Sequence, residues 1–164
     1  MIFETDDSEF VDQIRLSKNF LNDCLKTNLA YNFKYNLYTS YFANLKKLSN
    51  NFIPISICGK APNWYKGLQY KKLAPKWNFF KEWKENNDNE YYIKNFNEQI
   101  LNNLKLEDVL NDLKILAKSY NIQNNIQLNN ICLICYEKPD DFCHRHLVAN
   151  WFNKNGIQCI EIKK

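Results

Sequence analysis

The chain has 164 residues, of which 45% are hydrophobic and 24% are charged. This balance is typical of a globular protein of one domain with one core. The net charge of +4 is small for a dedicated nucleic-acid binder, which concentrates positive charge on one face. No apolar run approaches the ~18 to 20 residues that span a bilayer, so we expect no membrane association.

The N-terminus, MIFETDDSEF, is acidic and lacks the apolar core of a secretory signal. We therefore expect a cytoplasmic protein, and in that compartment its six cysteines would stay reduced. No resident cofactor is predicted, and the oligomeric state is left open.

Hydrophobic periodicity predicts alternating helices and strands along the chain. The predicted helices, in chain order, cover residues 8–27, 77–84, 93–104, 106–117 and 142–153. The predicted strands cover residues 37–42, 52–58, 131–136 and 157–162. Residues 63–89 are interpreted as a long irregular insert that contains the short second helix, and residues 121–130 as a polar connector.

Strands that alternate with helices require crossover connections, which favour a mainly parallel sheet. The run ICLICY at residues 131–136 is apolar throughout, as expected of a central strand that is covered on both faces. We predict a single compact α/β domain over residues 36–164, with its sheet flanked by helices. Residues 1–35 are predicted to be an N-terminal helical extension.

Basic and aromatic residues alternate between Lys60 and Lys84. Lysines bind phosphates and aromatic faces stack on bases, so this segment fits a nucleotide or nucleic-acid partner. The alternative is a solvated loop whose aromatic side chains pack onto the core.

The segment from Cys132 to Phe152 contains three of the six cysteines and both histidines. It is predicted to run from a strand through an acidic turn into a helix, where ligands bind in open α/β sheets. Cys143 falls near the predicted helix N-terminus, which stabilises a thiolate. Arg145 adds a fork suited to phosphate or carboxylate, and Glu137 is a candidate general base or a stabiliser of positive charge at a sugar carbon.

Metal binding by this segment is a separate possibility. Cys132 and Cys135 have C-x-x-C spacing, but strand residues three apart point to opposite faces, which argues against a closed zinc site. A site made from Cys135, Cys143 and His144 remains open. The spacing of a phosphatase loop, a cysteine followed by five residues and an arginine, is absent.

Each of these residues also has a purely structural interpretation. Cys143 would be a small buried apolar side chain, and His144 with Arg145 would brace the turn through hydrogen bonds. Glu137 would cap a helix or pair with Arg145, and His146 would lie on the helix surface.

Cys135-x-Glu137 followed by Cys143-His144-Arg145 resembles the signature of the domain of unknown function 488 family. The resemblance extends over about residues 37–164, through YTSYFANLKKL, PISICGKAPNWYKGLQYKKLAPKW, EYYIKNFNEQIL and LICYEKPDDFCHRHLVANWF. It implies a compact α/β fold with a parallel sheet. It also implies a pocket lined by Thr39 and Ser40 at the end of the first strand, the end of the second strand, and the cysteine-rich segment.

Many members of the family carry Asp-x-Arg after the second strand, where this chain reads Ser56-Ile57-Cys58-Gly59-Lys60. The departure removes a charged pair from the implied pocket. Lys60 replaces the charge of the arginine but not its planar fork.

Three functional hypotheses follow. The first is an enzyme, a hydrolase or one that acts on a glycosidic bond, with a nucleotide or nucleic-acid-like substrate. Its catalytic candidates are Glu137, Cys143 and His144. The candidate substrate-binding residues are Arg145, Lys60, Thr39, Ser40, Tyr38 and Trp64. The second hypothesis is a non-catalytic module that binds nucleic acid or a nucleotide, and the third is a metal or redox protein that uses Cys135, Cys143 and His144.

Overall fold

The computed structural model describes the backbone of residues 7–163 and the side chains from Arg15 to Lys163. The chain divides into two compact units, with the boundary between Phe33 and Lys34. The first unit contains one helix, α1 (Asp7–Asn32), which confirms the helix predicted over residues 8–27 and extends it by one residue at its start and five at its end. Residues 1–6, used above to argue against a secretory signal, lie outside the described part.

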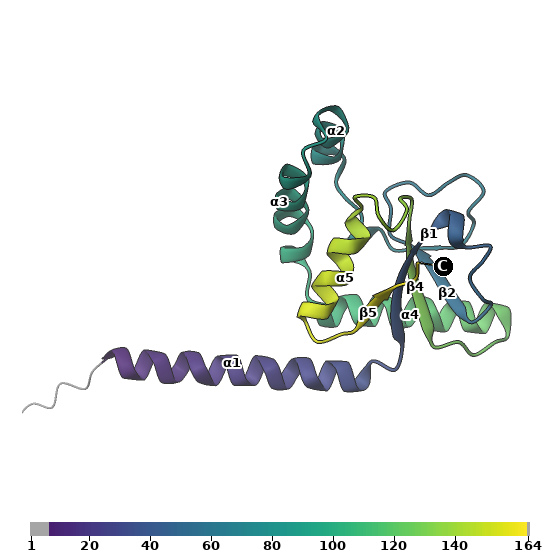
Figure 1. Ribbon diagram of the computed structural model, residues 1–164. Coiled ribbons are helices and arrows are strands. Elements are labelled where there is room, and N and C mark those ends of the chain that lie inside the picture. Colours follow the sequence, from purple (N-terminus) through teal and green to yellow (C-terminus); the bar gives the residue numbers. More distant parts are fainter. Residues whose placement is uncertain (1–6, 164) are drawn as a thin grey trace, which may run out of the picture. The chain divides into compact units, whose positions relative to one another are not determined.

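The second unit is built on one five-stranded sheet (Figure 1). Its strands are β1 (Asn36–Tyr41), β2 (Phe52–Ser56), β3 (Leu68–Gln69), β4 (Asn130–Cys135) and β5 (Cys159–Glu161). They lie in the order β3-β2-β4-β1-β5, and every neighbouring pair is parallel. The predicted α/β class with a mainly parallel sheet is therefore confirmed.

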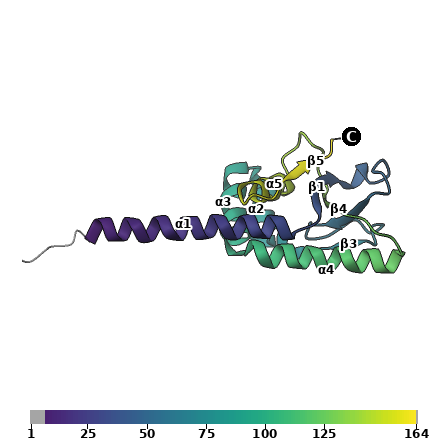
Figure 2. The ribbon, with the colours of Figure 1, turned by 90° about the horizontal axis from the view of Figure 1, so that it is seen from below.

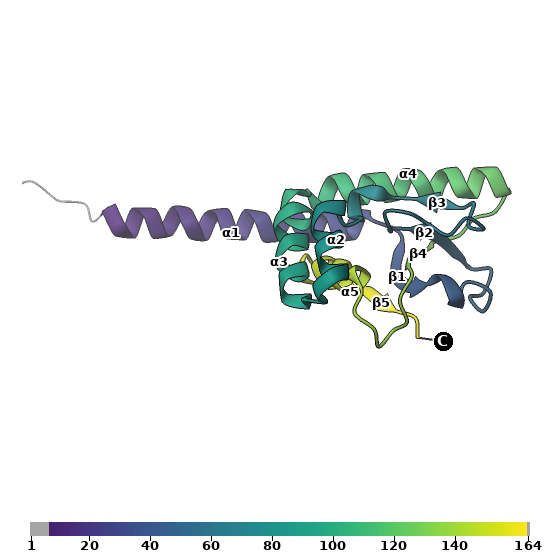
Figure 3. The same ribbon diagram turned by 90° about the horizontal axis from the view of Figure 1, so that it is seen from above.

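Four α-helices and three short 3-10 helices connect the strands of this unit. They are η1 (Phe42–Asn44), η2 (Lys71–Leu73), α2 (Trp77–Asn86), α3 (Asn89–Gln99), η3 (Leu101–Asn103), α4 (Leu106–Asn124) and α5 (His144–Lys154). Helix α5 lies between the sheet and α3 (Figure 1). The views from below and from above show α4 running along the sheet (Figures 2 and 3).

The core is centred on β4, which pairs with β2 on one side and β1 on the other. Ile131, Cys132, Leu133 and Ile134 are all fully buried, as predicted for a strand covered on both faces. Because β4 is central and its last residue is Cys135, the turn that follows it opens at the middle of the carboxyl edge of the sheet.

The ends of several elements differ from the sequence prediction for local reasons. The insert contains the predicted short helix as α2, and it is more regular than expected because it also contains β3 and η2. Helix α4 continues to Asn124 and ends where Asn125 takes a left-handed conformation (φ 52°), which shortens the predicted polar connector. Helix α5 starts at His144 rather than residue 142, because Cys143 is extended (φ −152°) and occupies the N-cap position.

Across residues 7–163, no helix combines the length and the apolar character that a membrane crossing requires.

Candidate functional site

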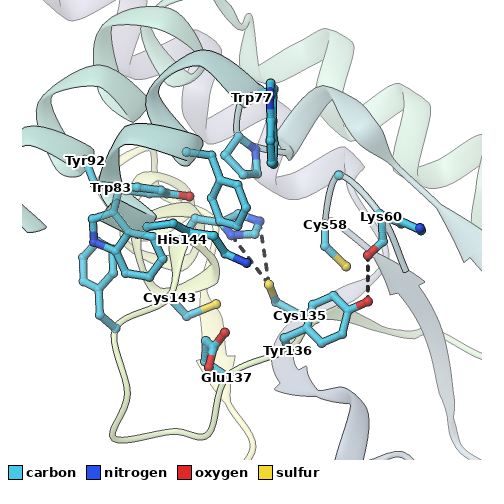
Figure 4. Close-up of a pocket in the computed structure, with 15 residues that line it drawn as sticks. Cys58, Lys60, Trp77, Trp83, Tyr92, Cys135, Tyr136, Glu137, Cys143 and His144 are labelled. Atoms are coloured by element: carbon cyan, nitrogen blue, oxygen red, sulfur yellow. Dashed lines mark hydrogen bonds between the residues drawn. The ribbon is translucent and has the colours of Figure 1, made fainter. Parts of the chain in front are cut away.

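A pocket of about 810 Å³ opens at the carboxyl ends of β2 and β4, beside the start of α5 (Figure 4). Three groups of side chains line it. The first, here called the thiol floor, comprises Cys58, Cys135, Cys143 and His144. The second, the aromatic wall, comprises Trp77, Phe80, Trp83, Tyr92 and Phe142. The charged residues of the lining are Lys60, Lys84 and Glu137.

The orientation of His144 organises the thiol floor. Its Nε2 lies 2.9 Å from the carbonyl oxygen of Ile57. A carbonyl only accepts hydrogen bonds, so Nε2 carries a proton and donates it to this carbonyl. Nδ1 lies 3.6 Å from the sulfur of Cys135, and the other face of the ring packs against Phe96 at a centroid distance of 5.4 Å. The imidazole is thus held between α3 and the end of β2, with Nδ1 directed at the thiols.

The three cysteines of the floor differ in pKa because they share hydrogen bonds. A hydrogen bond from Cys135, together with His144 and Arg145, lowers the pKa of Cys143 to about 3, although burial opposes this. Hydrogen bonding with the neighbouring sulfurs of Cys143 and Cys58, which compete for the single thiol proton of Cys135, and then burial, raises the pKa of Cys135 well above its usual value. The hydrogen bond from Cys135 also lowers the pKa of Cys58 to about 7. These shifts favour deprotonation of Cys143 over that of Cys135.

The aromatic wall comes mainly from α2 and α3. Trp83 packs against Tyr92 at 5.4 Å and against Phe142 at 5.5 Å between ring centroids, and Phe80 lies 6.0 Å from both Trp77 and Trp83. Trp77 keeps 66% of its surface exposed, which is a large apolar area to leave in water. The wall therefore leaves the ring of Trp77 available to a planar ligand.

Charged groups occupy the rim of the pocket. Glu137 is exposed, and Figure 4 shows its carboxylate beside the sulfur of Cys143. Partial burial raises the pKa of Glu137, and the negative charges of Cys143 and Asp141 raise it further. The side chain of Lys60 is exposed, while its carbonyl accepts a 2.8 Å hydrogen bond from the hydroxyl of Tyr136.

Arg145 does not reach this pocket. Its side chain is fully buried, and its Nε and Nη2 donate to the Glu161 carboxylate at 3.0–3.3 Å. Its Nη1 donates to the backbone carbonyl of Glu137 at 2.6 Å. The expected placement of Arg145 beside a bound anion is corrected, because its donors are used inside the protein. The anticipated ion pair between Arg145 and the Glu137 carboxylate is likewise replaced by the pair with Glu161.

Four more of the predicted binding residues also lie outside the pocket lining. Thr39 donates its hydroxyl proton to the Glu161 carboxylate, and fully buried Ser40 accepts a 3.1 Å hydrogen bond from Asn44. Tyr38 packs edge-on against Phe52. Trp64 is 60% exposed and packs edge-on against Phe42. Of the predicted substrate-binding residues, only Lys60 lines the pocket, whereas Glu137, Cys143 and His144 all do.

Four residues that line the pocket or support it, Cys58, Trp83, Lys84 and Glu161, were not among the predicted site residues. Cys58 reaches the floor because β2 ends beside β4, and strand order could not be read from the chain. Trp83 and Lys84 lie in the basic and aromatic insert. Its composition indicated a binding region, but it did not indicate which aromatic rings would contact one another. Glu161 had a weak signal, since an acidic residue two positions after buried Cys159 on a strand shares its face.

Parallel strands with a lined pocket at their carboxyl ends define an α/β protein whose site lies where such sheets bind ligands. A family model described as the active DUF488-N3 subclade matches residues 41–156. The chain therefore belongs to the DUF488 family, as the motif resemblance indicated, and the match includes every residue that lines the pocket. Searches of curated proteins and of solved structures give no match.

Proposed function

We propose that the protein is an enzyme that acts on the glycosidic bond of a nucleotide or a nucleic-acid-like substrate, with Glu137 as its acid/base residue. The single observation that carries the proposal is that one pocket combines an aromatic wall, two lysines and a carboxylate with a raised pKa. Planar bases stack on aromatic side chains, and lysines bind phosphate as point charges. Among common metabolites, nucleotides present a base, a phosphate and a sugar together.

The chemistry is a displacement at the sugar carbon. The bond from that carbon to its leaving group breaks with both electrons going to the leaving group, and a water oxygen forms the new bond. Glu137 accepts the proton of that water and returns it to the leaving group, so protons balance. A carboxylate whose pKa lies nearer to neutrality performs both transfers more readily.

Cys143 and His144 supply the polar floor under the reacting end. The thiolate of Cys143 is a second negative charge beside Glu137, and two negative charges favour a sugar carbon that develops positive charge as its bond breaks. Lys60 and Lys84 lie on the pocket rim, where they would hold the phosphate.

The catalytic test is base release from a panel of purine and pyrimidine nucleotides, followed by chromatography. Glu137→Gln should lower turnover by roughly 10²- to 10⁴-fold, the range for loss of a general acid/base. Glu98→Gln, at an exposed carboxylate of α3 outside the pocket lining, is the matched control and should retain full activity. Unchanged turnover in Glu137→Gln would remove the proposed role.

The binding test uses the two exposed tryptophans. Trp77→Ala should weaken nucleotide binding by about 5- to 150-fold, the equivalent of ~1–3 kcal/mol for one stacked base. Trp64→Ala removes a similarly exposed ring that does not line the pocket, so its affinity should stay unchanged. Nucleotides that bind tightly to the wild-type protein without any product would instead identify a binding module.

A further inference from the structure

We propose that Cys135, Cys143 and His144 form a binding site for a divalent transition-metal ion with the ligand preferences of zinc, and that its fourth coordination position faces the pocket. The inference goes beyond the proposed function, because the site would exist whatever substrate the pocket accepts, and with the ion bound Cys143 would be a metal ligand, which leaves Glu137 as the free negative charge proposed above.

The spacing of the ligand atoms suits zinc. The two sulfurs and an imidazole nitrogen all lie within 4.8 Å of one another, and Nδ1 of His144 is 3.6 Å from the sulfur of Cys135. Zinc binds sulfur at about 2.3 Å and nitrogen at about 2.0 Å in a tetrahedron, which places such a pair of ligand atoms about 3.5 Å apart. The Cys135–His144 distance thus already matches an occupied site.

The second observation is the hydrogen bond from Nε2 of His144 to the carbonyl of Ile57, at 2.9 Å. A histidine that binds a metal through one nitrogen almost always donates its other N–H to a carbonyl or carboxylate, which fixes the tautomer and the ring orientation. Here that outer hydrogen bond leaves Nδ1, the nitrogen nearest to Cys135, as the free ligand atom. The imidazole is therefore already oriented for metal binding by this hydrogen bond.

The backbone holds all three ligands rigidly. Cys135 is the last residue of β4, Cys143 is the N-cap of α5, and His144 is the first residue of that helix. Each side chain is at most 5% exposed, yet all three line the pocket. Three protein ligands and one position open to a cavity are the arrangement of catalytic rather than structural zinc sites.

Cys132 is not part of this cluster. It is fully buried in the middle of β4, it does not line the pocket, and it is not among the residues whose ligand atoms lie within 4.8 Å of one another. The C-x-x-C spacing is therefore misleading here, and the metal ligands come from the strand end and the helix start.

The test uses full-length protein, treated with a chelator and a non-thiol reductant, then titrated with Co²⁺ and competed with Zn²⁺. One Co²⁺ per chain should bind, with a thiolate charge-transfer band in the near ultraviolet and the intense visible bands of a tetrahedral ion. Cys135→Ser, Cys143→Ser and His144→Gln should each weaken Zn²⁺ binding by more than about 100-fold, since losing even an outer-shell partner costs roughly 10- to 100-fold.

Two matched controls accompany these variants. His146→Gln changes the other histidine of α5, which does not line the pocket, and Cys24→Ser changes an exposed cysteine of α1. Both should bind Zn²⁺ as the wild type does. X-ray absorption of zinc-loaded wild-type protein needs no variant and should show at least two sulfur neighbours and one imidazole. The absence of stoichiometric metal, or neighbours that are only oxygen and nitrogen, would overturn the proposal.

Discussion

Two neighbouring residues of α5, His144 and Arg145, point to different sides of the molecule and do different work. His144 lines the pocket with Cys143 and contacts Cys135, whereas Arg145 turns inward to Glu161 on β5. Successive helix residues diverge by about 100°, so residues adjacent in the sequence cannot serve one site merely because they are adjacent. In the Cys-His-Arg motif, Cys143 and His144 therefore belong to the pocket, whereas Arg145 belongs to a structural ion pair.

The support, here called the inner brace, comprises Arg145, Glu161 and Thr39. It meets the pocket at Glu137, whose backbone carbonyl accepts a hydrogen bond from Arg145 while its side chain lines the pocket. The brace thus fixes the turn from which Glu137 projects. If the inner brace and the pocket have separate roles, changes to the brace should mainly lower the stability of the fold. Changes to the pocket should mainly alter binding or turnover.

The largest expected effect is that of Arg145→Met, which leaves the Glu161 carboxylate, only 17% exposed, without its cation. Breaking a buried ion pair by removing one partner costs about 3–5 kcal/mol. The free energy of unfolding from urea denaturation measures the loss. Lys154→Met, at an exposed lysine of the same helix, should change it by no more than about 0.5 kcal/mol. A loss below about 1 kcal/mol for Arg145→Met would mean that the brace does not support the fold.

Thr39→Val should cost about 1.5–3 kcal/mol, because the fully buried hydroxyl donates to an ionised carboxylate. Combined with Arg145→Met it should cost less than the sum of the two losses, since both side chains act on Glu161. Denaturation of the single and double variants measures this coupling. Strictly additive losses would show that the three residues do not form one brace.

Lys72→Met sharpens the contrast between buried and exposed charge. Lys72 lies 2.7 Å from Asp112, but the two side chains are 61% and 31% exposed, and exposed pairs contribute about 0–1 kcal/mol. Asp112 also keeps its 2.7 Å hydrogen bond from Tyr70. The unfolding free energy should therefore fall by much less than in Arg145→Met, and a loss equal to that of Arg145→Met would contradict the comparison.

The smallest expected effect on stability is that of Glu137→Gln, within about 0.5 kcal/mol of the wild type, as is usual for exposed positions. The same denaturation experiment measures it, with Asp140→Asn in the same turn as the control. A loss greater than about 1 kcal/mol would place Glu137 in the brace rather than in the pocket.

The sequence was informative about features that depend on the residues of a single strand or helix. The apolar run of β4 predicted a buried central strand, and the motif that follows it predicted that Glu137, Cys143 and His144 lie at the end of the sheet. The choice among the functions proposed for them stays a prediction, because residue type and position do not specify a substrate.

What could not be predicted depends on long-range placement. One structural alternative paired Arg145 with Glu137, eight residues away, but its partner is Glu161, which comes close because β5 pairs with β1. The aromatic wall depends on how α2 and α3 pack against each other and on α3 beside α5. The periodicity of one helix does not predict this packing, because the packing depends on side chains from several elements at once.

The strand order has a consequence for biosynthesis. β1 is made early, yet both of its neighbours, β4 and β5, lie beyond residue 129. During translation, β1 cannot pair until roughly a hundred further residues have been synthesised. Pairings between segments that are distant in the sequence also form slowly. An unpaired strand that waits this long can associate with other chains, so the yield of folded protein should depend on how the cell shields residues 36–41 during translation.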